Sequence, residues 1–331
     1  MSNYIDKIKQ RIGKGELWAF SAALGYSFDN VFTAFALQGQ GINYYLGACL
    51  RSIPVFLLTI SVTLFSKKQK STETVSPFSD ARLFLALVAY GILTFFLGNT
   101  MFFSALQKGG VLITTPLAGT QVLWAALFAV LLLGEALNWK MVGGMATSIL
   151  GIGLLAVGKS GGVDLAPQWW LAIPLALGTA ICWSFSGVLI AYAQRRGVNR
   201  FHALLLALTV GLITLNVYML ITGQMDVYTT TALPLMRNVL LAGIFNMMAL
   251  IGITSALGMT SIASASTLGS LQVGLAPVFA WLLLGEQMNF LIGIGILLIL
   301  TGVIVVQISR ALEPVGEPAE IVLDDANPPL D

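Results

Sequence analysis

Long runs of apolar residues recur along nearly the whole chain, separated by short polar segments. A helix needs about 20 consecutive apolar residues to cross the hydrocarbon core of a bilayer, so each run predicts a transmembrane helix. The pattern predicts ten such helices, at about residues 17–36, 44–65, 83–106, 111–133, 140–158, 169–193, 201–222, 237–257, 262–284 and 290–309. We therefore expect an all-α membrane protein.

Composition supports this expectation and narrows the chemistry. Hydrophobic residues make up 57% of the chain and charged residues only 10%, whereas soluble domains carry about 25% charged residues. The two cysteines, Cys49 and Cys182, lie inside apolar runs and show no metal-binding or disulfide spacing. The single histidine, His202, excludes most zinc-site and catalytic-triad chemistry, and the net charge of +2 does not indicate a nucleic-acid partner. We expect no cofactor and no enzymatic activity.

The distribution of Lys and Arg predicts the orientation in the membrane. With the N-terminus in the cytosol, most basic residues outside the predicted helices fall on the cytosolic side, and only Lys108, Lys159 and Arg237 fall outside. Short cytosolic loops are enriched in Lys and Arg, so both termini are expected to be cytosolic. The short tails and the lack of glycosylation sequons favour a multi-pass protein of a prokaryotic inner membrane.

Residues 153–160 read GLLAVGKS and match the phosphate-loop pattern G-x-x-x-x-G-K-[ST]. A phosphate loop needs a strand before it and a helix N-terminus after it. Here the match ends an apolar run and is followed by glycines and a proline. It therefore predicts the C-terminal end of a membrane helix and no nucleotide site.

The chain contains two copies of one unit. Residues 121–139 read QVLWAALFAVLLLGEALNW, and residues 272–290 read QVGLAPVFAWLLLGEQMNF, a shift of 151 positions. Each copy has five predicted helices, an odd number, so the second copy must be inverted in the membrane, as in many secondary transporters. The predicted parts are an N-terminal arm (1–16), a first repeat (17–158), an outer linker (159–168), a second repeat (169–310) and a disordered acidic tail (311–331).

The stretch 276–306, APVFAWLLLGEQMNFLIGIGILLILTGVIVV, resembles the end of an EamA-type unit of the drug/metabolite transporter superfamily. The resemblance implies a secondary transporter, often an exporter, that moves small polar or amphiphilic metabolites such as amino acids through a central cavity by alternating access. Pro277 fits the family pattern, but the first copy has Ala126 there and Pro116 upstream, which leaves the shape of its fourth helix open. A nucleotide-sugar or drug/amine transporter of the same fold and a non-transporting membrane scaffold are the alternatives.

Two charged residues lie well inside predicted helices, Asp29 and Arg51. At about 1.5 Å per residue, both lie on the order of 10 Å below the outer edge. Ionisable groups at such depth are costly and are functional candidates. Either they form a static ion pair that joins the first two helices, or Asp29 binds the cationic group of the substrate or a proton, and Arg51 binds the carboxylate of the substrate. Proton coupling is left open, and the second copy has Ser186 at the position of Asp29.

Further candidates share helix faces or repeat positions with these charges. Tyr26, Asp29, Asn30 and Thr33 form a polar stripe at helical spacing. The equivalent residues of the second copy are Trp183, Ser186, Gly187 and Ile190, and we expect Tyr26 and Trp183 to meet across the pseudo-twofold axis.

The mid-helix amides Gln121 and Gln272 are equivalent and either join helices or contact substrate. Trp124 is expected to share the face of Gln121, and Asn99 and Asn246 complete the set. Glu135 and Glu286 lie at helix ends, where we expect them to meet headgroups or to cap the next helix. The expected partners are a small-molecule substrate and the lipid bilayer, with a monomer or a weak homodimer as the assembly.

Overall fold

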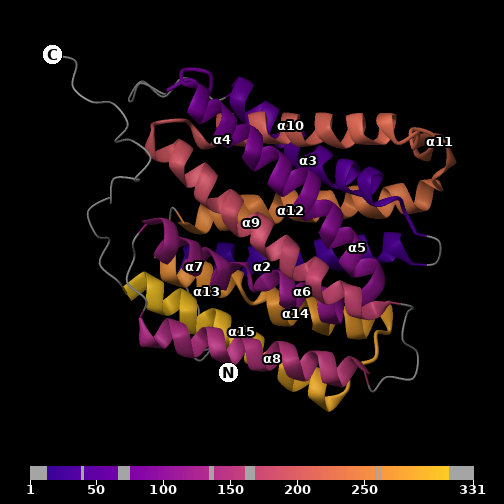
Figure 1. The fold of residues 1–331 in the computed structure, drawn as a ribbon, viewed down its shortest axis with the longest axis vertical. Coiled ribbons are helices and arrows are strands. Elements are labelled where there is room, and N and C mark those ends of the chain that lie inside the picture. The colour runs from indigo at the N-terminus through magenta and orange to yellow at the C-terminus, as the bar shows by residue number, and fades with distance from the viewer. Residues whose placement is uncertain are drawn as a thin grey trace, which may run out of the picture.

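The computed structural model describes residues 13–38, 41–65, 75–133, 138–160, 168–257, 259–260 and 262–312, which form a bundle of helices (Figure 1). The first part of the chain supplies α2 (Lys14–Leu37), α3 (Tyr44–Phe65), α4 (Ala81–Gly91), the π-helical segment η1 (Ile92–Gly98), α5 (Asn99–Gly109), α6 (Val111–Gly119), α7 (Gln121–Leu133) and α8 (Trp139–Ser160). The second part supplies the short 3₁₀ turn η2 (Trp169–Leu171), α9 (Ala172–Arg195), α10 (Arg200–Ile221), α11 (Val227–Thr230), α12 (Leu233–Leu257), α13 (Ile262–Gly269), α14 (Gln272–Phe279), the π-helical segment η3 (Ala280–Leu284) and α15 (Phe290–Leu312).

The chain is an all-α membrane protein. Within the described ranges, nine helical stretches are long and apolar enough to cross a bilayer. The one predicted helix that is not among these nine is the first, 17–36, which corresponds to α2. It carries Asp29 and other polar residues, so its mean hydropathy is too low. Its polar residues Ser27, Asp29, Asn30 and Thr33 are buried, because α2 packs along α12, α13 and α14.

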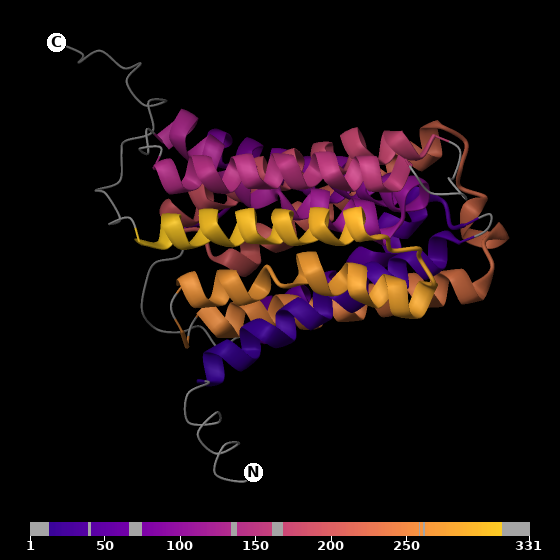
Figure 2. The same cartoon turned by 90° about the horizontal axis from the view of Figure 1, so that it is seen from below.

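The first and the last described helices have their outer ends at the same end of the bundle. In Figure 2, α2 begins and α15 ends on the same side, which we call the terminal end; α2 ends and α15 begins at the opposite, far end. The terminal end is the one that the distribution of Lys and Arg predicts to be cytosolic.

Two of the predicted helices are broken near their middle. The predicted helix 111–133 is divided at Thr120 into α6 and α7, and the predicted helix 262–284 is divided after Gly269 into α13 and α14. In each repeat a glycine ends the first piece, and glycine is a poor helix former. The Thr120 hydroxyl also donates to the Leu117 carbonyl at 2.6 Å, which competes with the helical bonding pattern. A hydropathy pattern passes over a break of one or two residues, so the sequence did not predict it.

The two repeats interlock. Helix α2 packs along α12, and α5 packs along α9, which is the same pairing with the roles of the repeats exchanged. The most extensive pairing, α8 with α15, also joins the two repeats. A Cβ added to Gly302 would lie 2.2 Å from Ser148 Oγ, and one added to Gly151 would lie 2.7 Å from the Gly295 carbonyl oxygen. These glycines therefore let the two helix backbones touch.

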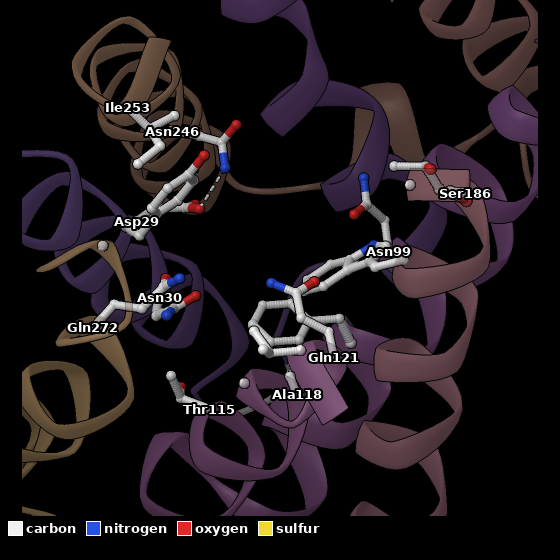
Figure 3. Close-up of a pocket in the computed structure, with 18 of the residues that line it drawn as sticks. Asp29, Asn30, Asn99, Thr115, Ala118, Gln121, Ser186, Asn246, Ile253 and Gln272 are labelled. Atoms are coloured by element: carbon white, nitrogen blue, oxygen red, sulfur yellow. Dashed lines mark hydrogen bonds between the residues drawn. The ribbon is translucent and has the colours of Figure 1, made fainter. Parts of the chain in front are cut away.

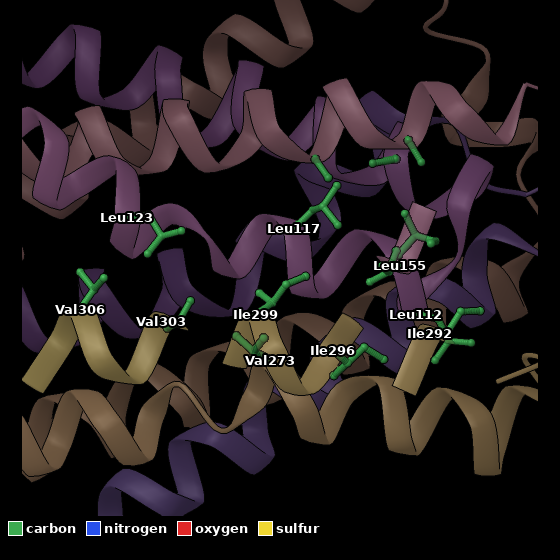
Figure 4. Packing of buried hydrophobic residues seen from close by; sticks show 14 of the residues in the cluster. Leu112, Leu117, Leu123, Leu155, Val273, Ile292, Ile296, Ile299, Val303 and Val306 are labelled. Carbon is green, nitrogen blue, oxygen red and sulfur yellow. The ribbon is translucent and has the colours of Figure 1, made fainter. Parts of the chain in front are cut away.

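An apolar cluster supports the α8–α15 pair. Figure 4 shows Leu112 and Leu117 of α6, Leu155 of α8, and Ile292, Ile296 and Ile299 of α15 packed together. Residues 153–160 form the C-terminal end of α8, so the phosphate-loop match is a helix end, as predicted.

Glu286 caps a helix of the other repeat. Its carboxylate accepts hydrogen bonds from the N–H groups of Val111 at 2.7 Å and Leu112 at 2.9 Å, at the start of α6. The expectation that it would cap the next helix in the chain is wrong, because Asn289 occupies that place and accepts from the Ile292 N–H at 2.9 Å. Glu135 lies outside the described residues.

Candidate functional site

A cavity of about 470 Å³ lies between two walls of helices in the middle of the bundle. One wall consists of α2, α12 and α14, and the other of α5, α7 and α9 (Figure 3). Because the repeats interlock, each wall contains helices from both. The cavity is lined by all of the predicted site residues except Trp124: Tyr26, Asp29, Asn30, Arg51, Asn99, Gln121, Trp183, Ser186, Asn246 and Gln272.

Asp29 and Arg51 form a bidentate ion pair. Arg51 Nε donates to Asp29 Oδ1 at 2.8 Å, and Arg51 Nη2 donates to Asp29 Oδ2 at 2.5 Å. Asn246 Nδ2 donates to Asp29 Oδ2 at 2.8 Å, and Thr33 Oγ1 lies 3.5 Å from Asp29 Oδ1. Asp29 is only 1% exposed. Both carboxylate oxygens therefore already have donors, which is how a buried charge is tolerated.

Arg51 also connects the two walls. Besides its bonds to Asp29 on α2, it donates through Nη1 to Asn99 Oδ1 on α5 at 3.2 Å. Its guanidinium lies 5.6 Å from the centre of the Phe102 ring, an arrangement that favours the cation. The ion pair, Asn99 and Asn246 thus form one network that spans α2, α3, α5 and α12.

The polar stripe of α2 faces the cavity as its spacing predicts. Tyr26, Asp29 and Asn30 line the cavity. Thr33 is not part of the lining, but its hydroxyl lies 3.5 Å from Asp29 Oδ1. The equivalent stripe of α9 also lines the cavity, with Trp183, Ser186, Gly187 and Ile190. The helical spacing therefore identified the inner face of both helices.

Two expectations about aromatic residues are wrong. Trp183 contacts Phe102, with ring centroids 5.3 Å apart, and not Tyr26, because α2 and α9 belong to opposite walls. Among the described residues of α7, only Gln121 and Val122 line the cavity. The helix begins at the cavity and then runs away from it, so Trp124 lies outside the site.

Several lining residues were missed by the sequence analysis, among them Tyr90, Thr94, Thr115, Ser270 and Gln307. Gln307 could have been found as a polar residue inside the apolar run 290–309. Thr115 and Ser270 gave no comparable signal, because serine or threonine occurs in every predicted helix and does not stand out there.

The lining extends toward the terminal end of the bundle. It includes Ile190 in a helix that ends at Arg195, Ile253 in one that ends at Leu257, and Gln307 in one that ends at Leu312. On the far side, a buried apolar cluster covers the cavity: Ala34, Leu37, Leu46, Phe102, Phe103, Leu106 and Val111. The polar network of Asp29 and Arg51 lies between this cluster and the open space.

Comparisons with known proteins agree with this architecture. The model of the EamA-like transporter family matches residues 13–157 and 170–308. A solved structure described as "Crystal structure of protein" is similar over 88% of this chain and 95% of its own, with 20% identity and a TM-score of 0.57, a likeness of fold alone. The comparison with curated proteins finds no match. The chain therefore belongs to the EamA-like transporter family, within the drug/metabolite transporter superfamily, and is a secondary transporter.

Proposed function

We propose that this protein moves a small polar or amphiphilic metabolite, such as an amino acid, across the membrane by alternating access, in the direction of export. The single observation that supports this most is the cavity of about 470 Å³ between the two walls, lined by polar side chains from both repeats. Ligand sites of inverted-repeat transporters lie at this place. Among the described lining residues Arg51 is the only basic one, which argues against a diphosphate-bearing nucleotide sugar.

We further propose roles for the predicted site residues. The ion pair of Asp29 and Arg51, with Asn99, holds the two walls together on the far side of the cavity. For that side to open, the walls must separate, so the bond between Arg51 and Asn99 has to break. The stripe of Tyr26 and Asn30 and the facing Trp183 and Ser186 would then contact the substrate.

The test is uptake of radiolabelled amino acids into proteoliposomes that contain the purified protein. We expect uptake above that of empty liposomes, and we expect Asp29→Asn to abolish it although the variant still inserts and purifies. An imposed pH gradient decides whether protons are coupled. Uptake that equals that of empty liposomes for amino acids, amines, sugars and nucleosides would support a scaffold instead.

We also propose the setting in which the transporter works. The repeats would extend over 17–158 and 169–310, joined by an outer linker, with both termini in the cytosol of a prokaryotic cell and the protein in its inner membrane. A monomer contains the whole cavity, so assembly beyond a weak homodimer is not required for transport.

A further inference from the structure

The cavity offers no net charge to a substrate. Among its described lining residues, the charged ones are Asp29 and Arg51, and they neutralise each other at 2.5 Å. A substrate with a net charge would therefore have no free counter-charge. An anionic substrate would have to displace Asp29 from Arg51, and a cationic substrate would have to displace Arg51 from Asp29. Either displacement leaves one buried charge without a partner.

Three neutral amides face the cavity from both walls. Asn30 comes from α2, Gln272 from α14, and Gln121 from α7 on the opposite wall. Figure 3 shows Gln121 projecting toward the wall that carries Asn30 and Gln272. Within the described part of the chain, none of these three amide groups has a side-chain hydrogen bond, unlike Asn99 and Asn246, which belong to the network around Asp29. Each amide offers donors and an acceptor.

Four further polar atoms of described lining residues are buried and lack a partner. They are the indole N–H of Trp183, the hydroxyls of Thr94 and Thr115, and the side-chain oxygen of Gln307. Buried polar groups in native proteins are nearly always hydrogen-bonded. These atoms are enclosed by protein in this conformation, so they show unused hydrogen-bonding capacity around the cavity and not a contact that a ligand makes from inside it.

The helix breaks explain why both glutamines lie on the lining of the cavity. Gln121 is the first residue of α7, and Gln272 is the first residue of α14. N–H groups at the two helix starts donate to carbonyls just before each break, since Leu123 donates to Thr120 at 2.8 Å and Val273 to Ser270 at 2.9 Å. The side-chain amides of the two glutamines are therefore the groups that these helix starts present to the cavity. The duplicated sequence thus presents the same element, a glutamine on a helix N-terminus, from each wall.

Resting on the proposed function, we propose that the transported compound carries no net charge, and that Asn30, Gln121 and Gln272 bind a polar edge of it that contains both a hydrogen-bond donor and an acceptor. Zwitterionic amino acids with an amide side chain and uncharged nucleosides meet both conditions. The lining aromatic residues Tyr26, Tyr90 and Trp183 cover its apolar part. The ion pair remains intact while the compound binds.

The experiment is calorimetric binding to the detergent-purified protein with compounds matched in shape. L-glutamine is compared with L-glutamate and L-lysine, and uridine with uridine monophosphate, within a wider panel of neutral and charged metabolites. We expect binding by net-neutral compounds and at least tenfold weaker binding by their charged counterparts. Gln121→Leu and Gln272→Leu should each weaken neutral binding roughly tenfold, the value of about one hydrogen bond. Gln194→Leu, at an exposed site near the end of α9, is the matched control and should bind as wild type.

The outcomes separate this inference from the proposed function. Preferred binding of charged compounds by the wild type would overturn the neutral-substrate inference and leave transport standing; this arm needs no variant to fold. Neutral binding that is unchanged in both glutamine variants would overturn the role of the amides. If no compound of either kind binds, both the inference and the proposed function fail.

Discussion

Removing the negative charge of Asp29 should cost much of the stability of the protein. In Asp29→Asn the shape is kept, but an amide can take the place of only one carboxylate oxygen as acceptor. Its NH₂ group would then face Arg51 Nη2, at 2.5 Å from Oδ2 in the wild type, and Asn246 Nδ2, at 2.8 Å. The guanidinium keeps its charge in a site that leaves Arg51 only 7% exposed. Breaking one side of a buried pair costs about 3–5 kcal/mol.

The assay is equilibrium unfolding in detergent micelles, read as a double-mutant cycle. Asp29→Asn and Arg51→Met should each lose about 3–5 kcal/mol, and the double variant should lose no more than either single variant, because no unpaired charge remains. Asp80→Asn is the matched control. Asp80 forms an exposed ion pair with Arg196 at 3.1 Å, and such pairs contribute about 0–1 kcal/mol. An Asp29→Asn variant as stable as Asp80→Asn, or strictly additive losses in the cycle, would refute the reasoning.

Three further predictions concern the scaffold. Gly302→Leu should destabilise the folded protein by about 1–3 kcal/mol, because the new Cβ would lie 2.2 Å from Ser148 Oγ. The control Gly153→Leu should not destabilise it, because an added Cβ there has no atom within 4 Å. Equal unfolding midpoints for the two variants would contradict this prediction. Asn99→Ala removes the hydrogen bond from Arg51 to the second wall, so cysteines placed on the far side should react faster with a water-soluble thiol reagent. An unchanged rate would show that this bond does not hold the two walls together. Burial raises the pKa of the Glu286 carboxyl above its ordinary value of about 4.5, although the two N–H bonds that it accepts lower it. The contribution of Glu286 to stability is therefore greatest in acid and falls as the pH rises from about 4.5 through the raised pKa. Glu286→Gln should show a flatter pH profile of unfolding than the wild type, and an identical profile would contradict this prediction.

The sequence predicted the helices well because membrane spans depend on length and hydropathy alone. The expected helix 44–65 coincides with α3, and the family match agrees with the resemblance found in residues 276–306. The breaks at Thr120 and after Gly269 were beyond reach, since they depend on local backbone bonding and not on hydropathy.

The candidate site was predicted to the extent that it follows from helical spacing. Spacing of three and four residues along α2 and α9 correctly gave the inner faces with Asn30 and Ser186. The same rule failed for Trp124, because α7 starts at the cavity and leaves it. Pairing of Tyr26 with Trp183 failed for a related reason: the repeats interlock, and which helices share a wall is decided by packing between repeats.

The central claim is that substrate passes through the cavity between the two walls, and a tryptophan placed in that cavity tests it most directly. Gly187 lines the cavity, and an added Cβ there has no atom within 4 Å, so Gly187→Trp should fold and fill the space. Gly153→Trp, on the exposed face of α8, is the control with equal bulk. In proteoliposomes with equal amounts of folded protein, we predict that Gly187→Trp loses amino-acid uptake and that Gly153→Trp retains it. Uptake by Gly187→Trp at the wild-type rate would contradict the account.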